Sequence, residues 1–351
     1  MLEEPNVFKN GEVLSPEYLP EILPHRENQV KAVADNLLPA ARNRKPQNTF
    51  IFGPPGIGKT ACVKFVFREF EEYSGVKTVY LNCWRFNTAT AVLSEIALGL
   101  GLFVQRHGWS KDEIVARLVE GIKKSGKGLI VCLDEVDQLI FKDQSVLYDL
   151  LRINQYVSNP IGLVFISNNP HVFAKVEPRI RSSLAIEEIE FKPYNLQEMK
   201  DILEERVKHA FTAVESGVVL LAANRAVQLG GDVRIGLECL LKAGRLAERE
   251  NESMVMVKHV KEVLKEAKPV KPKILKENVS EHEKLILDIL ESEKSLTTSG
   301  LYQMYCKASK KPVSDRAFRD FIRHLAELRL IKVSKKSGNI RMVSKKKTID
   351  L

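Results

Sequence analysis

The sequence predicts a chain of three parts: a parallel α/β sheet covered by helices, a small helical lid, and a C-terminal winged-helix domain. Short β-branched or aromatic segments alternate with helical stretches as far as residue 190. Strand signals are then absent to residue 267, and residues 281–351 suggest three helices followed by a hairpin. With 351 residues the chain is too long for one ordinary core, so two or three domains are expected.

Four segments of the first part have the composition of buried strands. Each is rich in β-branched or aromatic residues and is bounded by Gly, Asn or Pro: NTFIFG, TVYLNC, GLIVCLDE and IGLVFISN. Helical stretches fall between them, and this alternation implies a parallel sheet with helices on both faces. We therefore assign residues 1–190 to one α/β domain.

Residues 191–267 are predicted to form an all-helical domain. Asn195 can cap a helix that carries Met199 and Leu203 on its inner face. Further helical runs follow at residues 215–229, 232–249 and 257–267. Residues 268–280 contain two prolines and four lysines, a composition typical of a linker.

Residues 281–351 show the order of elements of a winged-helix domain. The first helix has an apolar face that includes Leu285 and Leu290, and a second helix lies around residues 298–307. Ser314 caps a third helix, which runs to about residue 329. The sequence IKVSKKSGNIRMVS then sets Ser-Gly-Asn between two β-prone runs, which is a hairpin signal.

The excess positive charge is confined to the C-terminal quarter of the chain. The whole sequence has a net charge of +9, yet residues 268–351 hold twenty basic and ten acidic residues. This asymmetry favours a polyanionic partner for the C-terminal part, although a solvated lysine-rich tail gives the same composition.

Composition also excludes several classes of protein. The five cysteines are widely separated and form no CxxC pair, so neither a zinc site nor a redox motif is expected. No apolar run approaches the roughly 18–20 residues of a membrane span, and the start MLEEPNVFKN is not a signal peptide. We expect no membrane partner and a location in the cytoplasm, associated with the nucleoid if the protein binds DNA.

Residues 53–60 read GPPGIGKT and match the phosphate-binding loop G-x-x-x-x-G-K-[ST] at every fixed position. The loop follows the strand TFIF and opens a helix, which is the context that the motif requires. Lys59 should reach the β- and γ-phosphates and Thr60 should offer its hydroxyl to Mg²⁺, so ATP or ADP and Mg²⁺ are the expected cofactors. The predicted nucleotide contacts are Gly53, Pro54, Pro55, Gly56, Ile57, Gly58, Lys59, Thr60 and Ala61.

The segment LIVCLDE, residues 129–135, ends a buried strand with two carboxylates. Asp134 can hold Mg²⁺ directly or through water, and Glu135 is the candidate that polarises the attacking water. Acidic residues after a strand are common, so this assignment depends on the accompanying phosphate loop. Asp137 continues the acidic run, and a solvent-facing or helix N-terminal position explains it at least as well.

The helix that follows Ser314 has one apolar and one basic side. Phe318, Phe321, Ile322, Leu325 and Leu328 share one side, whereas the opposite side carries Arg316, Arg319 and Arg323. Such a helix fits the major groove of DNA, where arginine bonds guanine edges or phosphates. The hairpin adds the basic residues Lys335, Lys336 and Arg341. Because Asp320 interrupts the basic side, a merely solvated helix face is the alternative.

These features together resemble the archaeal origin-recognition and cell-division-cycle (Orc/Cdc-type) family of AAA+ replication initiators. The resemblance begins with VFKNGEVLSPEYLPEILPHRENQ ahead of the loop, and LIVCLDEVD, FISNNP, EPRIRSSL and GGDVRIGL follow in the family's order. It implies an AAA+ fold, a weak ATPase that acts as a switch, and binding and deformation of double-stranded origin DNA. It also implies two protein partners, the replicative helicase and a paralogous initiator subunit.

The resemblance further implies roles for single residues. An adenine pocket would be formed by Leu23, Pro24, His25 and Arg26. Asn168 would orient the lytic water, although a turn residue that ends a strand is an alternative. Arg234 would report the γ-phosphate to the lid, although a surface arginine is an alternative; the neighbouring Val233 and Gly236 depart from the alanine-rich pattern expected there.

Two more expectations concern partners outside the nucleotide site. Arg179 and Arg181 are both candidates for a finger that enters the site of a neighbouring subunit, and the sequence does not decide between them. Residues of about 87–110 correspond to an initiator-specific insertion that approaches DNA, with Arg106 as the expected contact.

Two other classes of protein also combine such an ATPase with a winged helix. A Holliday-junction branch-migration motor would form rings and turn over ATP quickly on DNA. A regulatory ATPase that controls transcription would normally carry a further sensor domain, for which 351 residues leave no room.

Overall fold

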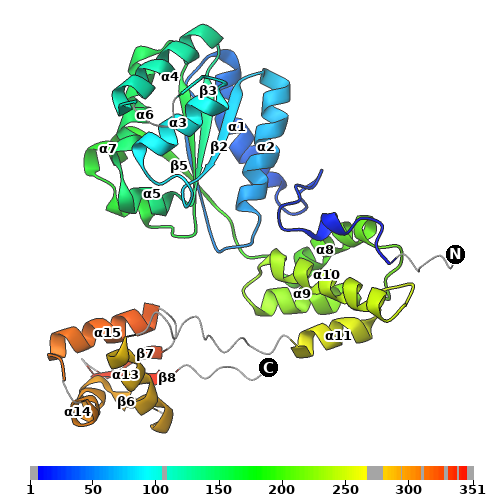
Figure 1. Cartoon of the computed structure of the whole chain (residues 1–351), viewed down its shortest axis with the longest axis vertical. Coiled ribbons are helices and arrows are strands. Elements are labelled where there is room, and N and C mark those ends of the chain that lie inside the picture. Colours follow the sequence, from blue (N-terminus) through cyan, green and yellow to red (C-terminus); the bar gives the residue numbers. More distant parts are fainter. Residues whose placement is uncertain are drawn as a thin grey trace. The chain divides into compact units, whose positions relative to one another are not determined.

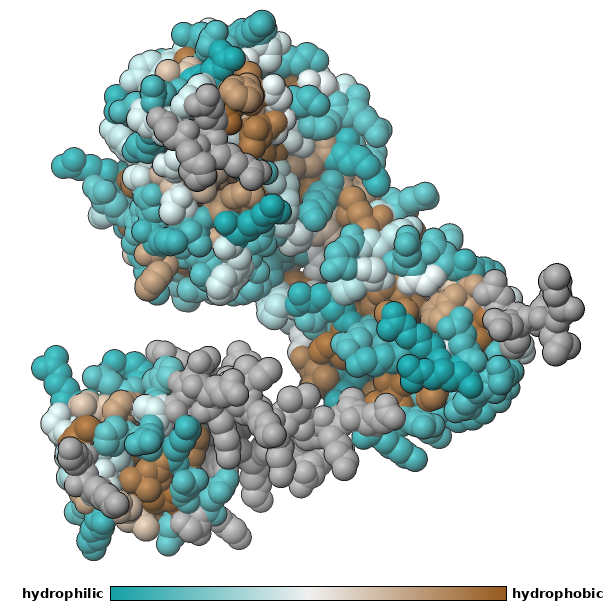
Figure 2. All heavy atoms as spheres, viewed as in Figure 1, coloured by the Kyte–Doolittle hydropathy of each residue, from teal (hydrophilic) through white to brown (hydrophobic). Residues whose placement is uncertain are grey.

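The computed structural model describes residues 7–104, 109–266, 280–293, 295–309, 312–327, 331–337 and 340–345. The chain divides into two compact units, Met1–Glu266 and Ala267–Leu351. Hydrophilic side chains cover most of the visible surface (Figure 2). Among the described helices, none has both the length and the apolar character needed to cross a bilayer.

A parallel sheet forms the centre of the first unit (Figure 1). Its strands pair in the order β2-β3-β4-β1-β5. They are β1 (Asn48–Phe52), β2 (Lys77–Asn82), β3 (Leu129–Asp134), β4 (Ile161–Ser167) and β5 (Ile186–Glu190). Every pair is parallel, and Phe50 of β1 and Leu133 of β3 both register with Phe165 of β4. The four predicted strands and their parallel arrangement are therefore confirmed.

Helices cover both faces of this sheet. One face is covered by α1 (Glu27–Leu37) and α2 (Lys59–Ser74), and the other by α3 (Ala89–Gly99), α4 (Lys111–Ser125), α5 (Val136–Lys142), α6 (Ser145–Tyr156) and α7 (Pro178–Leu184). Short 3₁₀ helices η2 (Leu38–Arg42) and η3 (Val172–Lys175) complete the connections. Successive strand residues enter opposite cores, because side chains alternate along a strand: Ile51 packs with α1 and α2, and Phe50 with α3 to α7.

The sequence does not predict strand β5, whose residues read IEEIE. Ile189 is buried, whereas Glu187, Glu188 and Glu190 are exposed. β5 pairs with β1 and forms one edge of the sheet. Charged side chains on an edge strand oppose pairing with another chain. The glutamates that make this strand hard to recognise in the sequence therefore suit its position at the edge.

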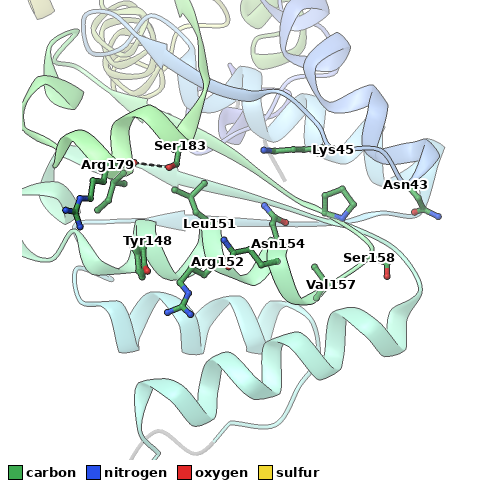
Figure 3. A pocket seen from close by; sticks show the side chains of 13 residues that line it. Asn43, Lys45, Tyr148, Leu151, Arg152, Asn154, Val157, Ser158, Arg179 and Ser183 are labelled. Atoms are coloured by element: carbon green, nitrogen blue, oxygen red, sulfur yellow. Dashed lines mark hydrogen bonds between the residues drawn. The ribbon is translucent and has the colours of Figure 1, made fainter.

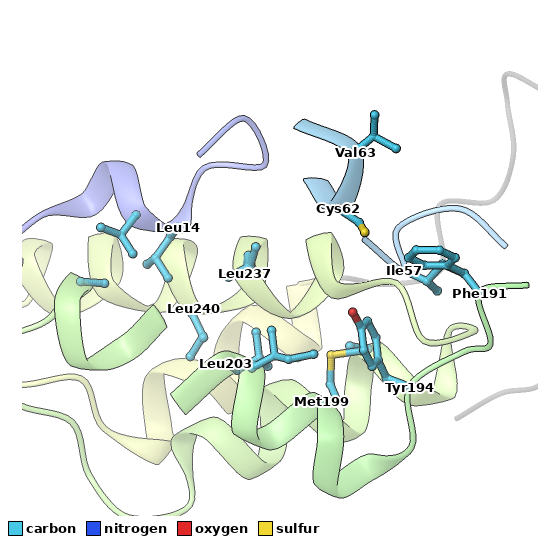
Figure 4. Close-up of a cluster of buried hydrophobic side chains, with 14 of the residues drawn as sticks. Leu14, Ile57, Cys62, Val63, Phe191, Tyr194, Met199, Leu203, Leu237 and Leu240 are labelled. Carbon is cyan, nitrogen blue, oxygen red and sulfur yellow. The ribbon is translucent and has the colours of Figure 1, made fainter. Parts of the chain in front are cut away.

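The lid consists of α8 (Leu196–Ala210), α9 (Val218–Gln228), α10 (Val233–Arg249) and α11 (Val257–Glu266), with η1 (Gly11–Leu14) packed on it. Asn195 caps α8, as predicted, in a reciprocal pair with Glu198. One cluster of buried side chains runs from α2 through Phe191 and Tyr194 to Met199 in the lid (Figure 4). The lid and the sheet therefore share a hydrophobic core.

The described residues of the second unit form three helices and a small antiparallel sheet. They are α13 (Glu281–Ser292), α14 (Thr298–Ala308) and α15 (Asp315–Glu327), with β6 (Leu296–Thr297), β7 (Ile331–Ser337) and β8 (Ile340–Lys345) in the order β6-β8-β7. Tyr305 and Phe318 are buried in one core with Ile331 and Val343. These elements have the order that the winged-helix prediction requires, with the short strand β6 added.

Candidate functional site

The loop between β1 and α2 has the geometry of a phosphate cradle. Gly53, Gly56 and Gly58 have φ angles of +147°, +72° and +90°, which side-chain-bearing residues rarely adopt. A Cβ at Gly53 would lie 2.2 Å from the carbonyl oxygen of Phe191, so the loop also packs too tightly for alanine. Gly58 is the N-cap of α2 and caps it with no side-chain bond, which leaves the N–H groups of the first turn for an anion.

Lys59 lies inside this loop. Its Nζ donates to the carbonyl oxygens of Gly53 and Pro54, both at 2.7 Å, and to Oδ1 of Asn168 at 2.8 Å. The side chain is buried, and burial lowers the pKa of the Lys59 ammonium to about 8 despite the nearby charges of Asp134 and Glu135. The ammonium is therefore short of a negative partner, which a phosphate group would supply.

The lowered pKa of Lys59 makes nucleotide affinity depend on pH. A bound phosphate stabilises the protonated ammonium, so binding requires proton uptake once the pH exceeds the free-site pKa of about 8. We expect the dissociation constant for ADP to be steady near neutral pH and to rise toward roughly tenfold per pH unit above that value. Calorimetry in buffers of different ionisation enthalpy measures the uptake, and an affinity that stays constant well above pH 8 would contradict this assignment.

The two predicted Mg²⁺ ligands lie in direct contact. Thr60 Oγ1 donates to Oδ2 of Asp134 at 2.7 Å, and the Tyr80 hydroxyl donates to the same oxygen at 2.6 Å. The other oxygen, Oδ1, accepts from the backbone N–H of Glu135 at 2.8 Å. A hydroxyl beside a fixed carboxylate is an oxygen-only ligand set, which suits Mg²⁺. Burial and Asp134 raise the pKa of Tyr80, so this residue, which the sequence analysis does not identify, remains a donor.

Glu135 and Asn168 are brought together by the pairing of β3 with β4. The Asn168 Nδ2 lies 3.4 and 3.3 Å from the two carboxylate oxygens of Glu135, while its Oδ1 accepts from Lys59. Glu135 has a left-handed backbone with φ of 54°, an uncommon conformation that often marks functional residues. Burial, together with Asp134 and Asp137, raises the pKa of Glu135 and makes it a better proton acceptor.

The residues expected in the adenine pocket lie beside the loop. Arg26 is buried, and its Nε donates to the carbonyl of Ile57 at 3.2 Å while Nη2 donates to that of Lys192 at 2.8 Å. Its guanidinium also lies 3.8 Å from the ring centre of Tyr194. Arg26 thus joins the loop to the segment that leads into the lid.

The other three members of this set differ in their surroundings. Leu23 packs against the same core as α2, and His25 pairs with Asp201 of α8 through an Nε2–Oδ2 distance of 2.9 Å. Pro24 is partly exposed between them. Contact with adenine stays a prediction for all four residues.

Arg234 lies in the first turn of α10, close to the loop. Its guanidinium pairs with Asp232, the N-cap residue, through contacts of 3.0 and 2.8 Å. The neighbouring N–H of Val233 donates to the carbonyl of Gly56 at 3.0 Å. Gly236 allows close packing of α10 on α8, because a Cβ there would lie 2.7 Å from a methyl of Leu203. Arg234 therefore lies near the loop even though Val233 and Gly236 stand where the family pattern is rich in alanine.

Arg179 and Arg181 are exposed on α7. Arg179 lines a cleft of about 500 Å³ with Lys45, Tyr148 and Arg152, and no residue of the phosphate loop takes part (Figure 3). The structure thus gives Arg179 a place in a cleft that the phosphate loop does not line, and for both arginines a role toward a neighbouring subunit stays a prediction.

Helix α15 has the two sides that the sequence predicts. Phe318 and Leu325 are buried, while Arg316, Arg319 and Arg323 are exposed. The Ser314 hydroxyl accepts from the N–H of Ala317 at 3.4 Å, which is the expected cap. The basic side is partly neutralised, however: Arg319 pairs with Asp315 at 2.6 Å and Arg323 with Asp320 at 3.0 Å.

The remaining predicted DNA contacts fall on less fully described parts of the chain. Lys335 registers with Arg341 in the β7–β8 pair, and Lys336 follows on β7. The side chains of these three residues, like Leu328 and Arg106 as a whole, lie outside the described residues.

Comparison with known proteins identifies both parts of the first unit. A model of the AAA domain family matches residues 42–172, and one of the Cdc6 AAA+ ATPase-type lid domain matches residues 200–265. The sequence is 38% identical over 347 residues to ORC1-type DNA replication protein 1 of Archaeoglobus fulgidus, covering 94% of this chain and 85% of the relative.

Solved structures show the same fold along the chain. The Aeropyrum pernix ORC1 protein in complex with DNA is 32% identical, with a TM-score of 0.72 over 97% of this chain and 94% of the other. The ORC2 protein of the same organism, in ADPNP–ADP complexes, has a TM-score of 0.78 at 22% identity over 97% and 94%. The RuvB Holliday junction branch migration motor of Thermotoga maritima has a TM-score of 0.54 at 15% identity over 95% and 96%, which shows a shared fold alone.

Proposed function

The chain belongs to the family of ORC1-type DNA replication proteins, and from this we propose that it is an ATP-switched initiator that binds and deforms duplex origin DNA and helps recruit the replicative helicase. The observation that carries the proposal is the presence of two sites in one chain. The first is the loop site, where Lys59, Thr60 and Asp134 meet Glu135 and Asn168. The second is the arginine side of α15.

The loop site would hold ATP and Mg²⁺ through groups that already converge. The loop glycines and the start of α2 would bind the phosphates, Lys59 would add its charge, and Thr60 with Asp134 would hold the metal. Bound Mg²⁺ supplies neutralisation of phosphate charge. Glu135, positioned by Asn168, would accept a proton from the attacking water, which makes the protein a weak ATPase whose hydrolysis resets the switch.

The α15 helix would read or grip the duplex through its arginines. The A. pernix ORC1 relative is solved in complex with DNA. Arg316, Arg319 and Arg323 recur at spacings of three and four along one side, so all three can face a single groove. Arg319 and Arg323 would exchange their ion pairs with Asp315 and Asp320 for phosphate or guanine. Deformation of the duplex would add specificity at base pairs that no side chain touches.

Replacing Arg316 and Arg319 together by alanine should weaken duplex binding about tenfold or more and lower the salt slope by roughly one to two units. Nucleotide affinity should not change, because α15 belongs to the second unit. Fluorescence anisotropy with labelled origin DNA at several salt concentrations measures both quantities.

A matched control removes two arginines that also sit in helical ion pairs. Arg68 pairs with Glu69 and Arg117 with Glu120 on the first unit, so Arg68→Ala with Arg117→Ala changes the net charge equally. This variant should bind DNA almost as well as the wild type. Equal losses in the two double variants would mean that α15 is no more than a solvated surface.

The switch itself is tested by identifying the nucleotide released on denaturation and by measuring ATP turnover with and without duplex DNA. Retained ADP and slow turnover that DNA barely changes support the initiator. Fast turnover that DNA stimulates would instead favour a branch-migration motor, the fold of which this chain shares.

Two protein partners follow from the same proposal. Arg179 or Arg181 on α7 would enter the nucleotide site of a paralogous subunit, because both are exposed and Arg179 lines a cleft to which the loop of its own chain does not contribute. The replicative helicase would be the second partner. Co-assembly on DNA that is lost in an Arg179→Ala, Arg181→Ala variant, with nucleotide binding intact, would support the first of these contacts.

A further inference from the structure

Asp232 connects the lid arginine to the N-terminus of α10. Its Oδ1 accepts from the backbone N–H of Arg234 at 2.9 Å, which caps the helix. The same carboxylate holds the guanidinium of Arg234, with Nε to Oδ1 at 3.0 Å and Nη2 to Oδ2 at 2.8 Å. Two parallel N–H···O bonds of this kind fix an arginine in position as well as in charge.

The Asp232 carboxylate also forms part of the wall of the phosphate loop. A Cβ at Gly56 would lie 1.8 Å from its Oδ1 and 2.4 Å from its Oδ2, so the carboxylate fills the space that a side chain at residue 56 would need. The bond from the Val233 N–H to the Gly56 carbonyl, at 3.0 Å, holds the helix end in this place. The side chain of Asp232 is only 18% exposed, which keeps its negative charge poorly screened.

A negative group at this wall competes with a bound phosphate. Arg234 directs two of its five N–H donors, on Nε and Nη2, to Asp232, so it can present this two-pronged edge to a terminal phosphate only by giving up the pair. Only a triphosphate carries the additional phosphate that can replace Asp232 as the partner of Arg234. The free energy of the ion pair is therefore subtracted from ATP binding and not from ADP binding.

We propose that Asp232 is a positioning residue that sets the preference of the site for ATP over ADP, by holding Arg234 until a terminal phosphate takes its place. The inference rests on the proposed nucleotide switch. In the ADP state Asp232 keeps Arg234 and the end of α10 against the loop, and in the ATP state it releases the arginine. The lid thus receives a signal that depends on the terminal phosphate alone.

The test compares Asp232→Asn with the wild type in the full chain, using a non-hydrolysable ATP analogue and ADP, each with Mg²⁺. Asparagine has the same shape and caps a helix as well as aspartate, so the variant removes the charge and keeps the cap. We expect the ratio of the analogue affinity to the ADP affinity to rise about three- to fivefold. In an Arg234→Ala background, Asp232→Asn should leave this ratio unchanged.

Glu238→Gln is the matched control, because Glu238 lies on the same helix and pairs with Lys242 at 2.6 Å. It should not change the ratio. An unchanged ratio in Asp232→Asn, or an equal fall in both affinities, would show that Asp232 is only a helix cap and would overturn the proposal. A wild-type chain that binds neither nucleotide would instead refute the nucleotide switch itself.

Discussion

Replacing Glu135 by glutamine is expected to slow ATP hydrolysis by about 10²- to 10⁴-fold while nucleotide affinity stays within a few-fold of the wild type. Glutamine keeps the size of the side chain and its contact with Asn168, but it cannot accept a proton. The Lys59 and Thr60 contacts that would hold the nucleotide do not involve the Glu135 side chain. Single-turnover hydrolysis of labelled ATP separates this loss from any change in binding.

Asp137→Asn is the matched control for this experiment. Asp137 is the next carboxylate along the chain, but it lies in the first turn of α5 and accepts from the Ser167 hydroxyl at 2.8 Å. Its replacement should leave hydrolysis within several-fold of the wild type. If the glutamine variant at position 135 also hydrolyses ATP within several-fold of the wild type, Glu135 is not the group that activates water.

The parts of the site that the sequence predicts are those whose residues are close together along the chain. The phosphate loop is contiguous, and Asp134 and Glu135 follow directly on a buried strand. Because parallel strands end at the same edge of a sheet, Asn168 at the end of the neighbouring strand could also be assigned. For these residues the local pattern and the strand order together determine the geometry.

The parts that the sequence does not predict depend on contacts between distant segments. Tyr80 reaches Asp134 from β2, and Arg26 joins the carbonyl of Ile57 in the loop to that of Lys192 in the connection to the lid. The sequence indicates that Asp232 caps a helix, because it directly precedes one, but nothing in the sequence indicates that Asp232 lies against Gly56. A single sequence contains no information on such pairs.

For the basic side of α15, the prediction from the sequence takes Asp320 into account but not Asp315. The pairing of Asp315 with Arg319 has the i, i+4 spacing that favours ion pairs on a helix, and that of Asp320 with Arg323 has the i, i+3 spacing. The sequence therefore held this information, and the helix is less free to attract phosphate than its arginines alone suggest. Arg316 has no ion pair among the described residues, which makes it the most available of the three.

The second large effect is expected at Arg26. The resemblance places this residue in the adenine pocket, and the structure places it in a buried position between the phosphate loop and the segment that leads into the lid. Its guanidinium lies 5.1 Å from the ring centre of Phe191 and 3.8 Å from that of Tyr194. Its two hydrogen bonds hold the carbonyl of Ile57 in the loop and that of Lys192 in the connection to the lid. A charge in this position is stabilised by carbonyl dipoles and ring faces, without a carboxylate partner at hydrogen-bonding distance among the described residues.

Arg26→Ala should lower the free energy of unfolding of the first unit by about 3 kcal/mol and weaken nucleotide binding at least tenfold. Truncation leaves two inward carbonyls without their donor and opens a cavity between the loop and Tyr194, so the loop loses its support on one side. Urea unfolding followed by tryptophan fluorescence reports this unit alone, since Trp84 and Trp109 are the chain's two tryptophans.

Arg206→Ala is the control for this experiment. Arg206 is partly buried, donates to the carbonyl of Val13 at 3.1 Å and lies 4.9 Å from the ring centre of Tyr18. It should cost stability and leave nucleotide affinity unchanged, because these contacts tie the N-terminal segment to the lid and do not reach the loop. Equal affinities in the two variants would mean that Arg26 supports the fold without shaping the nucleotide site.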